Sequence, residues 1–195
     1  MVSTGSGGSS STAERSLDVA ERLVQVRGYN GFSYADVAGE LEITTATLQY
    51  HFPGKAQLGA ALIARYSERF SDALPSIDHN LHDARAKLEA YAELYAGVLR
   101  SKRMCLCGIL AAEYETLPEA MRQAVTRFFI DNETWLTAVL TQGQRDGTLS
   151  IVGSTQDAAR TILSGLEGTI LVARTHGGLS GFEASASRLL AAVTA

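Results

Sequence analysis

Apolar residues recur every three or four positions along almost the whole chain after residue 12. This spacing places them on one face of a helix, and no stretch shows the two-residue alternation typical of a strand. The pattern predicts an all-α protein with helices over residues 13–28, 34–40, 45–50, 55–73, 84–100, 105–116, 119–145, 155–176 and 182–194. Because proline interrupts helices, we expect Pro75 to end the fourth helix before a polar linker over 76–83, and Pro118 to end the sixth.

The second and third predicted helices are short and are joined by a tight turn. Five apolar residues take the inward-facing positions of this pair: Val37, Ala38, Leu41, Ile43 and Leu48. Two short helices crossing at a steep angle form a helix-turn-helix, which places its second helix in the major groove of DNA. The alternative is that the pair is ordinary packing in a helical protein.

Polar side chains around the second helix of this pair are candidate DNA contacts. Ser33 precedes one helix, and Thr44 or Thr45 precedes the next, where a hydroxyl caps free N–H groups. The hydroxyl, amide and imidazole groups that follow can donate hydrogen bonds to phosphates, and Gln49 could also read adenine. Lys55 lies at the start of a further helix, a favourable place for a phosphate. The predicted DNA-binding residues are Ser33, Thr44, Thr45, Thr47, Gln49, Tyr50, His51 and Lys55.

This segment resembles the DNA-binding head of the TetR family of bacterial transcriptional regulators, over Ala20 to Leu58. The shared residues are Gly28-Tyr29, Phe32-Ser33, Asp36-Val37-Ala38, Leu41-Glu42-Ile43-Thr44, Ala46-Thr47-Leu48, Tyr50-His51-Phe52-Pro53-Gly54-Lys55 and Leu58. Two positions depart from the family's pattern. Glu42 stands where the family usually has glycine, and a non-glycine residue at positive φ costs roughly 1–2 kcal/mol. Gln49 stands where the family usually has tyrosine, so Tyr50 would take over its phosphate contact, or the contact is lost.

The resemblance implies a helix-turn-helix head followed by a helical bundle that binds a ligand and dimerises. We therefore expect a head over residues 13–54 and a body over 55–195, after a disordered tail over 1–12 that is rich in serine and glycine. The implied function is a transcriptional repressor that a small molecule releases from its double-stranded DNA operator. An activator is compatible with the same residues.

Charge is unusual for a DNA-binding head. Residues 13 to 55 contain four basic and six acidic residues, a net charge of −2, and the whole chain carries −4. A basic surface normally provides most of the affinity for phosphates. We therefore expect few ionic contacts, reliance on hydroxyl, amide and backbone donors, and a dimer that doubles them.

The predicted helix over 155–176 is apolar on more than one face, and it has small residues at 164, 165 and 168. The resemblance implies a homodimer in which this helix and the last one meet their copies. The predicted interface residues are Ile162, Gly165, Leu166, Gly168 and Ile170. The alternative is an ordinary core helix of a monomer.

The helices from 84 to 140, with Tyr66 nearby, contain aromatic residues and a few polar ones, a mixture typical of a site for an apolar ligand. Among them, Glu113 needs a partner because it is a carboxylate among apolar neighbours. For each of these residues the alternative is core packing, or a surface ion pair for Glu113. The predicted ligand-binding residues are Tyr66, Tyr91, Tyr95, Met104, Cys107, Leu110, Glu113, Phe128, Phe129 and Trp135.

Cys105 and Cys107 suggest an alternative function, a thiol-, redox- or metal-responsive regulator, because nearby Arg103 could lower their pKa. Two cysteines lack the further ligands of a closed zinc site, so we predict no metal and no cofactor. Enzymatic motifs are absent, which favours a regulator over an enzyme. No apolar run reaches about 18 residues and no signal peptide is recognisable, so we expect a cytoplasmic protein.

Overall fold

The computed structural model describes residues 11–193, so residues 1–10 of the expected tail lie outside the described part. Ser11 and Thr12, also assigned to that tail, are ordered, because Ser11 caps the first helix and pairs reciprocally with Glu14. The helices are α1 (Thr12–Arg27), α2 (Tyr34–Leu41), α3 (Thr45–His51), α4 (Lys55–Asn80), α5 (Ala84–Arg100), α6 (Leu106–Ala112), α7 (Glu119–Arg145), α8 (Thr155–Thr175) and α9 (Gly178–Val193).

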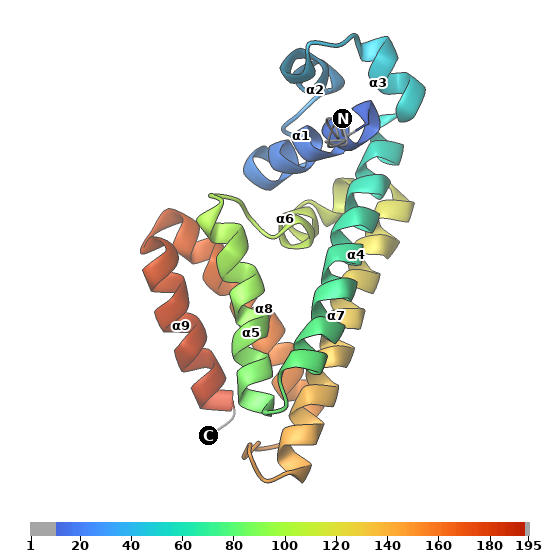
Figure 1. The fold of residues 1–195 in the computed structure, drawn as a ribbon. Helices are drawn as coiled ribbons and strands as arrows, with labels where there is room; N and C mark the ends of the chain where they lie inside the picture. Colours follow the sequence, from blue (N-terminus) through green and yellow to red (C-terminus); the bar gives the residue numbers. More distant parts are fainter. Residues whose placement is uncertain (1–10, 194–195) are drawn as a thin grey trace, which may run out of the picture.

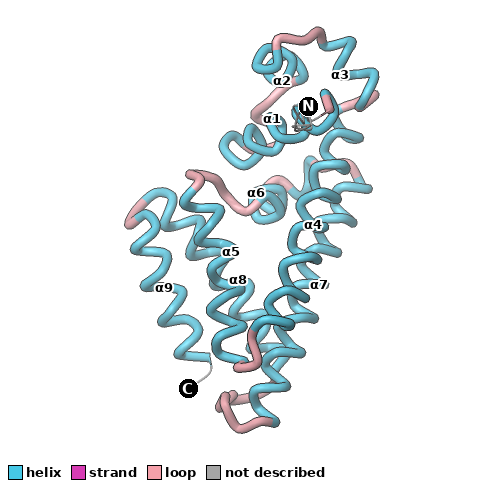
Figure 2. Tube along the Cα trace, in the orientation of Figure 1, coloured by secondary structure: helices cyan, strands magenta, loops and turns pink. Residues whose placement is uncertain are grey.

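The all-α prediction is confirmed, since residues 11–193 form helices and loops without a strand (Figure 2). Helices α1 to α3 form a small head at one end of the molecule, and the long helix α4 runs from this head into the body (Figure 1). In the body, α4 packs on α7, α7 on α8, and α9 on both α8 and α5. Helix α6 lies directly beneath α1 and so joins the body to the head.

Helix α4 does not end at Pro75, and the expected linker over 76–83 is mostly helical. The helix continues through the proline to Asn80. Its last turns are held by long-range contacts at Asp78, whose carboxylate accepts a hydrogen bond from Trp135 Nε1 at 2.9 Å and pairs with Lys87 Nζ at 2.9 Å. The prediction was wrong because these contacts with α7 and α5 offset the cost of an interior proline.

Other predicted helix ends also differ from the structure. Helix α6 ends at Ala112, and only a 3-10 turn over Tyr114–Thr116 separates it from the loop before Pro118. Helix α8 begins at Thr155, as the pattern predicts, and Ser154 caps it by accepting a hydrogen bond from the Asp157 amide. Helix α9 begins at Gly178, four residues before the predicted start at 182. Among the residues described, no helix has the length and apolar character needed to cross a membrane.

Candidate nucleic-acid interface and ligand cavities

Side-chain caps fix the ends of the two short helices in the head. The Ser33 hydroxyl accepts from the Asp36 amide and the Asp36 carboxylate accepts from the Ser33 amide, which makes a complete capping box for α2. Thr44 caps α3, because its Oγ1 accepts from the Thr47 amide at 3.1 Å. Of the two predicted caps for α3, Thr44 is therefore used and Thr45 is the first helical residue.

The turn between α2 and α3 has the positive φ at Glu42 that the family pattern implies. Glu42 adopts the left-handed conformation at φ 55°, ψ 39°, and its amide closes the end of α2 on Ala38 and Gly39. Val37, Ala38 and Leu48 are buried. Leu41 and Ile43 are half-buried and pack against the same core. The turn and this small core orient α3 with its other faces toward solvent.

The outer face of α3 is polar and exposed. Thr45, Thr47, Gln49 and His51 are exposed, and Tyr50 is 85% exposed with its ring edge-on to His51 at 5.2 Å. Helix α3 lies at the end of the molecule farthest from α9 (Figure 1). An exposed tyrosine and an imidazole beside two threonines and a glutamine give this face hydrogen-bond donors at a position free of the body.

Lys55 contradicts the expectation of a free cation at the start of α4. Its Nζ donates to the Phe32 carbonyl at 2.5 Å and lies over the rings of Tyr29 and Phe32, at 4.6 and 4.4 Å from their centroids. Burial lowers the pKa of Lys55, partly opposed by Glu113 and Asp36. The ammonium therefore stabilises the fold of the head, and the sequence pattern missed this because both rings precede the lysine by more than 20 residues.

Glu113 was predicted to bind a ligand, but it lies at a joint where the body contacts the head. Its carboxylate accepts hydrogen bonds from the backbone amides of Tyr29 at 2.6 Å and Asn30 at 3.4 Å. Asn30 Nδ2 adds a hydrogen bond to Thr116 Oγ1 at 2.7 Å. Gly28, at φ +85°, leaves room for this carboxylate, since a Cβ there would lie 2.6 Å from Glu113 Oε1. The expected partner of Glu113 is thus main chain rather than a ligand.

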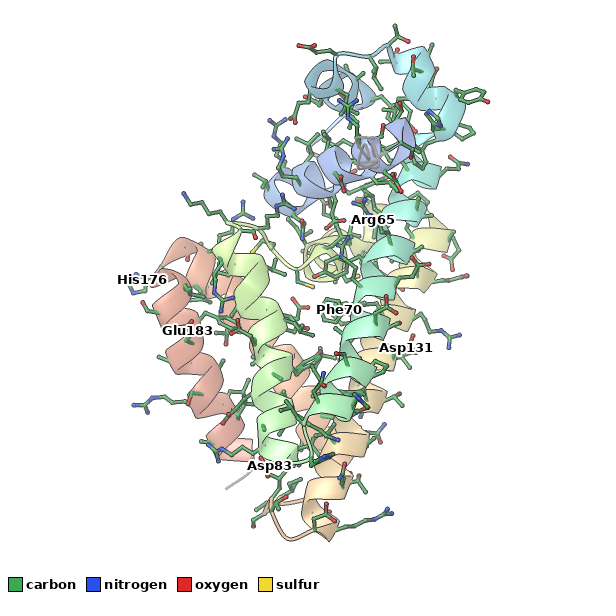
Figure 3. The ribbon with its side chains drawn as sticks, viewed as in Figure 1. Arg65, Phe70, Asp83, Asp131, His176 and Glu183 are labelled. Atoms are coloured by element: carbon green, nitrogen blue, oxygen red, sulfur yellow. The ribbon has the colours of Figure 1, made fainter. Side chains whose placement is uncertain are left out.

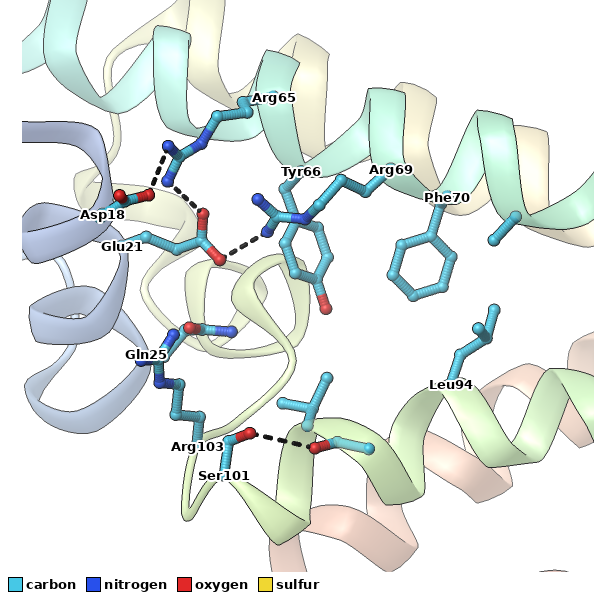
Figure 4. A pocket seen from close by; sticks show the side chains of 13 residues that line it. Asp18, Glu21, Gln25, Arg65, Tyr66, Arg69, Phe70, Leu94, Ser101 and Arg103 are labelled. Carbon is cyan, nitrogen blue, oxygen red and sulfur yellow. Dashed lines mark hydrogen bonds and ion pairs between the residues drawn. The ribbon is translucent and has the colours of Figure 1, made fainter. Parts of the chain in front are cut away.

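A second joint connects α1 to α4 through the Glu21 ion-pair cluster, which comprises Asp18, Glu21, Arg65 and Arg69. Arg65 pairs with Glu21 at 2.8 Å and with Asp18 at 2.7 Å, and Arg69 pairs with Glu21 at 2.5 Å. The Glu21 side chain is only 7% exposed. A buried carboxylate shared by two arginines holds the first helix of the head against the helix that enters the body (Figure 4).

Directly beside this cluster lies the α1–α4–α5 cleft, a cavity of about 650 Å³ bounded by those three helices and the loop after α5. Phe70 extends from α4 toward α5, where Leu94 faces it (Figures 3 and 4). The cleft is lined by Asp18, Glu21, Gln25, Arg65, Tyr66, Arg69, Phe70, Ala73, Leu94, Gly97, Val98, Ser101 and Arg103. Of the predicted ligand-binding residues, only Tyr66 lines it.

Other predicted ligand-binding residues form the packed centre of the body. Tyr91, Tyr95, Cys107, Leu110 and Phe128 are almost fully buried. The Tyr91 hydroxyl donates to Asn132 Oδ1 at 2.9 Å, and the Tyr91 ring stacks on Trp135 at 5.5 Å between centroids. The structure places these side chains in the core, which was the alternative interpretation for each of them.

A smaller cavity of about 270 Å³, the Glu167 pocket, lies between α6, α7 and α8, and the predicted residues Met104 and Phe129 line it. Glu167 points its carboxyl group inward, where Oε1 has no hydrogen-bond partner among the described residues. Burial raises the pKa of Glu167 to about 7, opposed by hydrogen bonds with Cys105 and Tyr95. Gly108 allows this approach, because a Cβ there would overlap Glu167 Oε2.

The residues that sequence reasoning missed are polar and charged ones around these two cavities. They include Asp18, Glu21, Gln25, Arg65, Arg69, Arg103, Glu167 and Arg174. Arg65 and Arg69 stand four apart and flank Tyr66, so both could have been placed on one helix face. Glu167 could have been noticed as a carboxylate within the apolar 155–176 segment.

Cys105 and Cys107 are both free and buried. Burial raises the pKa of each thiol, with nearby Glu167 adding to the shift. This is the opposite of the lowered pKa on which a reactive thiol depends. Among the described residues, no group of three potential metal ligands occurs. Cys105 instead caps α6, its sulfur accepting from the Gly108 amide at 3.4 Å.

The predicted dimer residues on α8 divide into two sets. Ile162, Leu166 and Ile170 are 0% exposed within the single chain, so the expectation that they face a partner is wrong. A Cβ at Gly165 would overlap Leu189 of α9, so Gly165 serves packing between α8 and α9. Gly168 is exposed with open space at its Cβ, and Leu171 and Val172 beside it are 59% and 60% exposed.

Two capped short helices joined by a tight turn, with the second helix exposed at the end of a helical body, define a DNA-binding regulator of the helix-turn-helix class. Residues 17–62 match the bacterial regulatory proteins of the tetR family, and residues 84–188 match the tetracyclin repressor-like C-terminal domain. The chain belongs to the TetR family of transcriptional regulators.

Solved structures of this family are similar along the whole chain. A TetR family transcriptional regulator from Agrobacterium tumefaciens is 32% identical, with a TM-score of 0.90, and the match covers 94% of this chain and 97% of that one. A TetR transcriptional regulator from Legionella pneumophila is 30% identical, with a TM-score of 0.86, and the match covers 96% and 100% of the two chains. No curated protein matches the sequence.

Proposed function

We propose that this regulator is a homodimeric repressor that inserts α3 into the major groove of its operator and is released when a small molecule binds the α1–α4–α5 cleft. The observation that supports DNA binding most directly is the exposed polar face of α3, capped by Thr44 and backed by buried Leu48. The observation that supports release is that the Glu21 ion-pair cluster both lines this cleft and holds α1 of the head against α4.

The proposed DNA contacts come from two parts of the head. Thr47, Gln49, Tyr50 and His51 lie on the exposed face of α3 and provide donors for phosphates and base edges. Ser33, Thr44 and Thr45 lie at the starts of α2 and α3, where unpaired backbone amides favour an anion. Lys55 contributes indirectly, by stabilising the core of the head. With so few free cations, each chain depends on neutral donors, and two chains are needed for useful affinity.

The proposed dimer face combines the exposed part of α8 with its junction to α9. Leu171 and Val172 are large apolar side chains left uncovered in the single chain. Beside them runs a groove of about 530 Å³ between α8 and α9, lined by small residues that include Gly168, Gly177 and Gly181. Projecting apolar side chains next to a groove of glycines suit a symmetric interface in which each chain fills the other's groove.

We expect Leu171→Asp combined with Val172→Asp to give a folded monomer. Both side chains are exposed in the single chain, so the charges should be tolerated there but should oppose burial against a partner. Light scattering reports the mass and circular dichroism the fold. The matched control is Val152→Asp, because Val152 is 97% exposed in the loop that precedes α8, at the opposite end of that helix from Leu171 and Val172. A dimeric double variant would contradict this face. Leu166→Arg, by contrast, should unfold the protein.

The proposed mechanism is a shift between two arrangements of the head. In a dimer that binds DNA, the two α3 helices must lie roughly 34 Å apart, one turn of the double helix. A ligand that binds one arrangement of α1 and α4 more tightly than the other changes this separation and weakens binding to the operator. The thiol-responsive alternative is not favoured, because both sulfurs are buried.

The test of this function is binding to DNA from the neighbourhood of the protein's own gene. In an electrophoretic shift assay at fixed salt, we expect one promoter fragment to bind at least 100-fold more tightly than random DNA of equal length, as is typical of specific binding. A footprint should cover two half-sites related by a two-fold axis. Equal affinity for promoter and random fragments would contradict the proposal.

A further inference from the structure

We propose that the α1–α4–α5 cleft takes an anion with an apolar body, such as an aromatic or aliphatic carboxylate, and that the anionic group binds Arg103 and competes with Glu21 for Arg65 and Arg69. This inference rests on the proposed function, because it names the class of effector for the same cleft. Its support lies in the charges, the unpaired polar atoms and the apolar floor of the cleft.

The charges that line the cleft favour an anion. Three arginines and two acids face it, so its lining is positive within a chain whose net charge is −4. Asp18 and Glu21 are already paired with Arg65 and Arg69. Arg103 makes no ion pair with any described residue. A cation entering the cleft would find its carboxylates occupied, whereas an anion would find a guanidinium free to form two parallel hydrogen bonds.

Two buried polar atoms of the lining lack partners among the described residues. Arg65 Nε is a donor without an acceptor, although the other two nitrogens of its guanidinium are paired. Gln25 Oε1 is an acceptor without a donor, while Gln25 Nε2 donates to the Met104 carbonyl at 2.9 Å. Unpaired buried groups of this kind are costly. A ligand oxygen near Arg65 and a ligand hydroxyl or bridging water near Gln25 would satisfy them.

The remaining surface of the cleft is apolar and aromatic. Phe70 on α4 faces Leu94 on α5, and Tyr66 lies between Phe70 and the Arg65 side chain (Figure 4). Ala73 and Val98 also line the cleft. The charged groups thus cluster at the end near the head, and the apolar groups lie toward the body (Figure 4). A ligand with one charged end and a hydrocarbon body of moderate size matches this arrangement, because about 650 Å³ lies within the usual range for small-molecule sites.

Binding of such an anion would act on the joint with the head. Arg69 is 48% exposed and holds Glu21 from the solvent side, so it can turn toward an incoming carboxylate. Glu21, on α1, would then retain only Arg65. The anion would thus weaken the contact between α1 and α4. Because DNA binding depends on the same arrangement of the head, linkage requires the affinity for DNA to change as well.

The test uses three probes that share one apolar body and differ only in charge. They are 4-phenylbutanoate, 4-phenylbutan-1-ol and 4-phenylbutylamine, titrated calorimetrically into the full chain at pH 7.5. We expect the carboxylate to bind at least tenfold more tightly than the alcohol and the amine to bind more weakly than either. Equal affinities, tightest binding of the amine, or no binding of any probe up to 5 mM would overturn the inference.

Variants locate the site. Arg103→Gln should weaken binding of the carboxylate about tenfold and leave the alcohol unchanged, because Arg103 makes no ion pair within the part of the chain that the structure describes. The matched control is Arg100→Gln, since Arg100 is paired with Glu93 and does not line the cleft. Carboxylate binding that is insensitive to Arg103→Gln would overturn the inference.

A separate assay distinguishes failure of the inference from failure of the proposed function. If the promoter fragment binds specifically but the carboxylate does not bind the protein, the effector class is wrong and the function as a DNA-binding regulator stands. If the carboxylate binds through Arg103 but saturating amounts leave the affinity for the promoter unchanged, the site is correct and release by ligand at this cleft is wrong. We expect saturating carboxylate to weaken promoter binding at least fivefold.

Discussion

Tyr50→Ala should weaken binding to the operator about 30-fold without destabilising the protein. Tyr50 is 85% exposed and, among residues 11–193, its ring makes only an edge contact with His51, so its loss removes almost no core packing. If its hydroxyl donates to a phosphate, each chain loses about 1 kcal/mol of binding free energy. The dimer loses two such contacts, and about 2 kcal/mol corresponds to roughly 30-fold in the dissociation constant.

The measurement is fluorescence anisotropy with a labelled operator at fixed salt, together with a thermal melt of each protein. Tyr114→Ala is the matched control, because Tyr114 is also partly exposed but lies in the turn after α6, outside the proposed DNA-binding face. The control should bind the operator like the unchanged protein. Equal loss of affinity in both variants, or none in Tyr50→Ala, would show that Tyr50 does not contact DNA.

Local sequence rules were sufficient for the caps and the turn of the head, because the residues that determine them are close together in the chain. A cap acts within three residues, so Ser33 and one of two threonines could be assigned directly. The family pattern placed Glu42 where a left-handed residue is needed, and the structure has it at φ 55°. Lys55 was misjudged because its partners, Tyr29 and Phe32, reach it only through the folded head.

In the body, local sequence rules were not sufficient to assign the role of each side chain. Periodicity identified α8 as apolar on more than one side, but it could not tell which side covers the chain's own core and which is left exposed. Ile162 and Leu166 therefore appeared as interface residues, although α5, α7 and α9 bury that side of α8. Glu113 was misjudged for a related reason, since its partners Tyr29 and Asn30 lie 84 and 83 residues away along the chain. Pro75 was misjudged because the turns after it are held through Asp78, which bonds to Trp135, 57 residues away.

The α1–α4–α5 cleft could not be predicted as a unit, because its walls come from three separate segments. Residues 18–25, 65–73 and 94–103 meet there only after α5 has packed on α4 and α1 has docked on α4 and on the loop after α5. The aromatic residues that looked most suitable for a ligand, such as Tyr91 and Tyr95, instead pack against one another. Composition pointed to the helices from 84 to 140 and to Tyr66, and of those predicted residues only Tyr66 lines this cleft. Only the fold separates side chains that line a cavity from those that fill the core.

Glu167→Gln should raise the stability of the protein at pH 8 and leave it almost unchanged at pH 4.5. The pKa of Glu167 is raised from its ordinary value of 4.5 to about 7, chiefly because its carboxyl group is buried. The folded protein therefore holds the proton more tightly than the unfolded chain does. The contribution of Glu167 to the free energy of unfolding is fully present below about pH 4.5, its pKa in the unfolded chain. This contribution is lost as the pH rises through about 7, its pKa in the folded protein. By about pH 8 the loss amounts to roughly 3 kcal/mol.

Glutamine keeps the shape of the protonated side chain and cannot ionise, so it should remove this loss. For a chain of this size, about 3 kcal/mol corresponds to an increase in Tm of roughly 6–12 °C at pH 8. The buried neighbours Tyr66, Tyr91, Tyr95, Cys105 and Cys107 all have their pKa raised by burial, so they stay neutral over this range and Glu167 is the group of this cluster that titrates.

Thermal melts at half-unit steps between pH 4.5 and 8.5 would follow the effect. The matched control is Glu183→Gln, because Glu183 is an exposed glutamate on α9 (Figure 3) and its replacement should leave the pH profile unchanged. The Tm difference between Glu167→Gln and the unchanged protein should grow from about pH 4.5 to pH 7 and level off above pH 7, where the folded and unfolded chains bind equally few protons at this group. A difference of constant size at every pH would mean that packing, rather than the ionisation of Glu167, determines it. A loss of stability at pH 8 would mean that the ionised carboxylate has a partner in the folded protein.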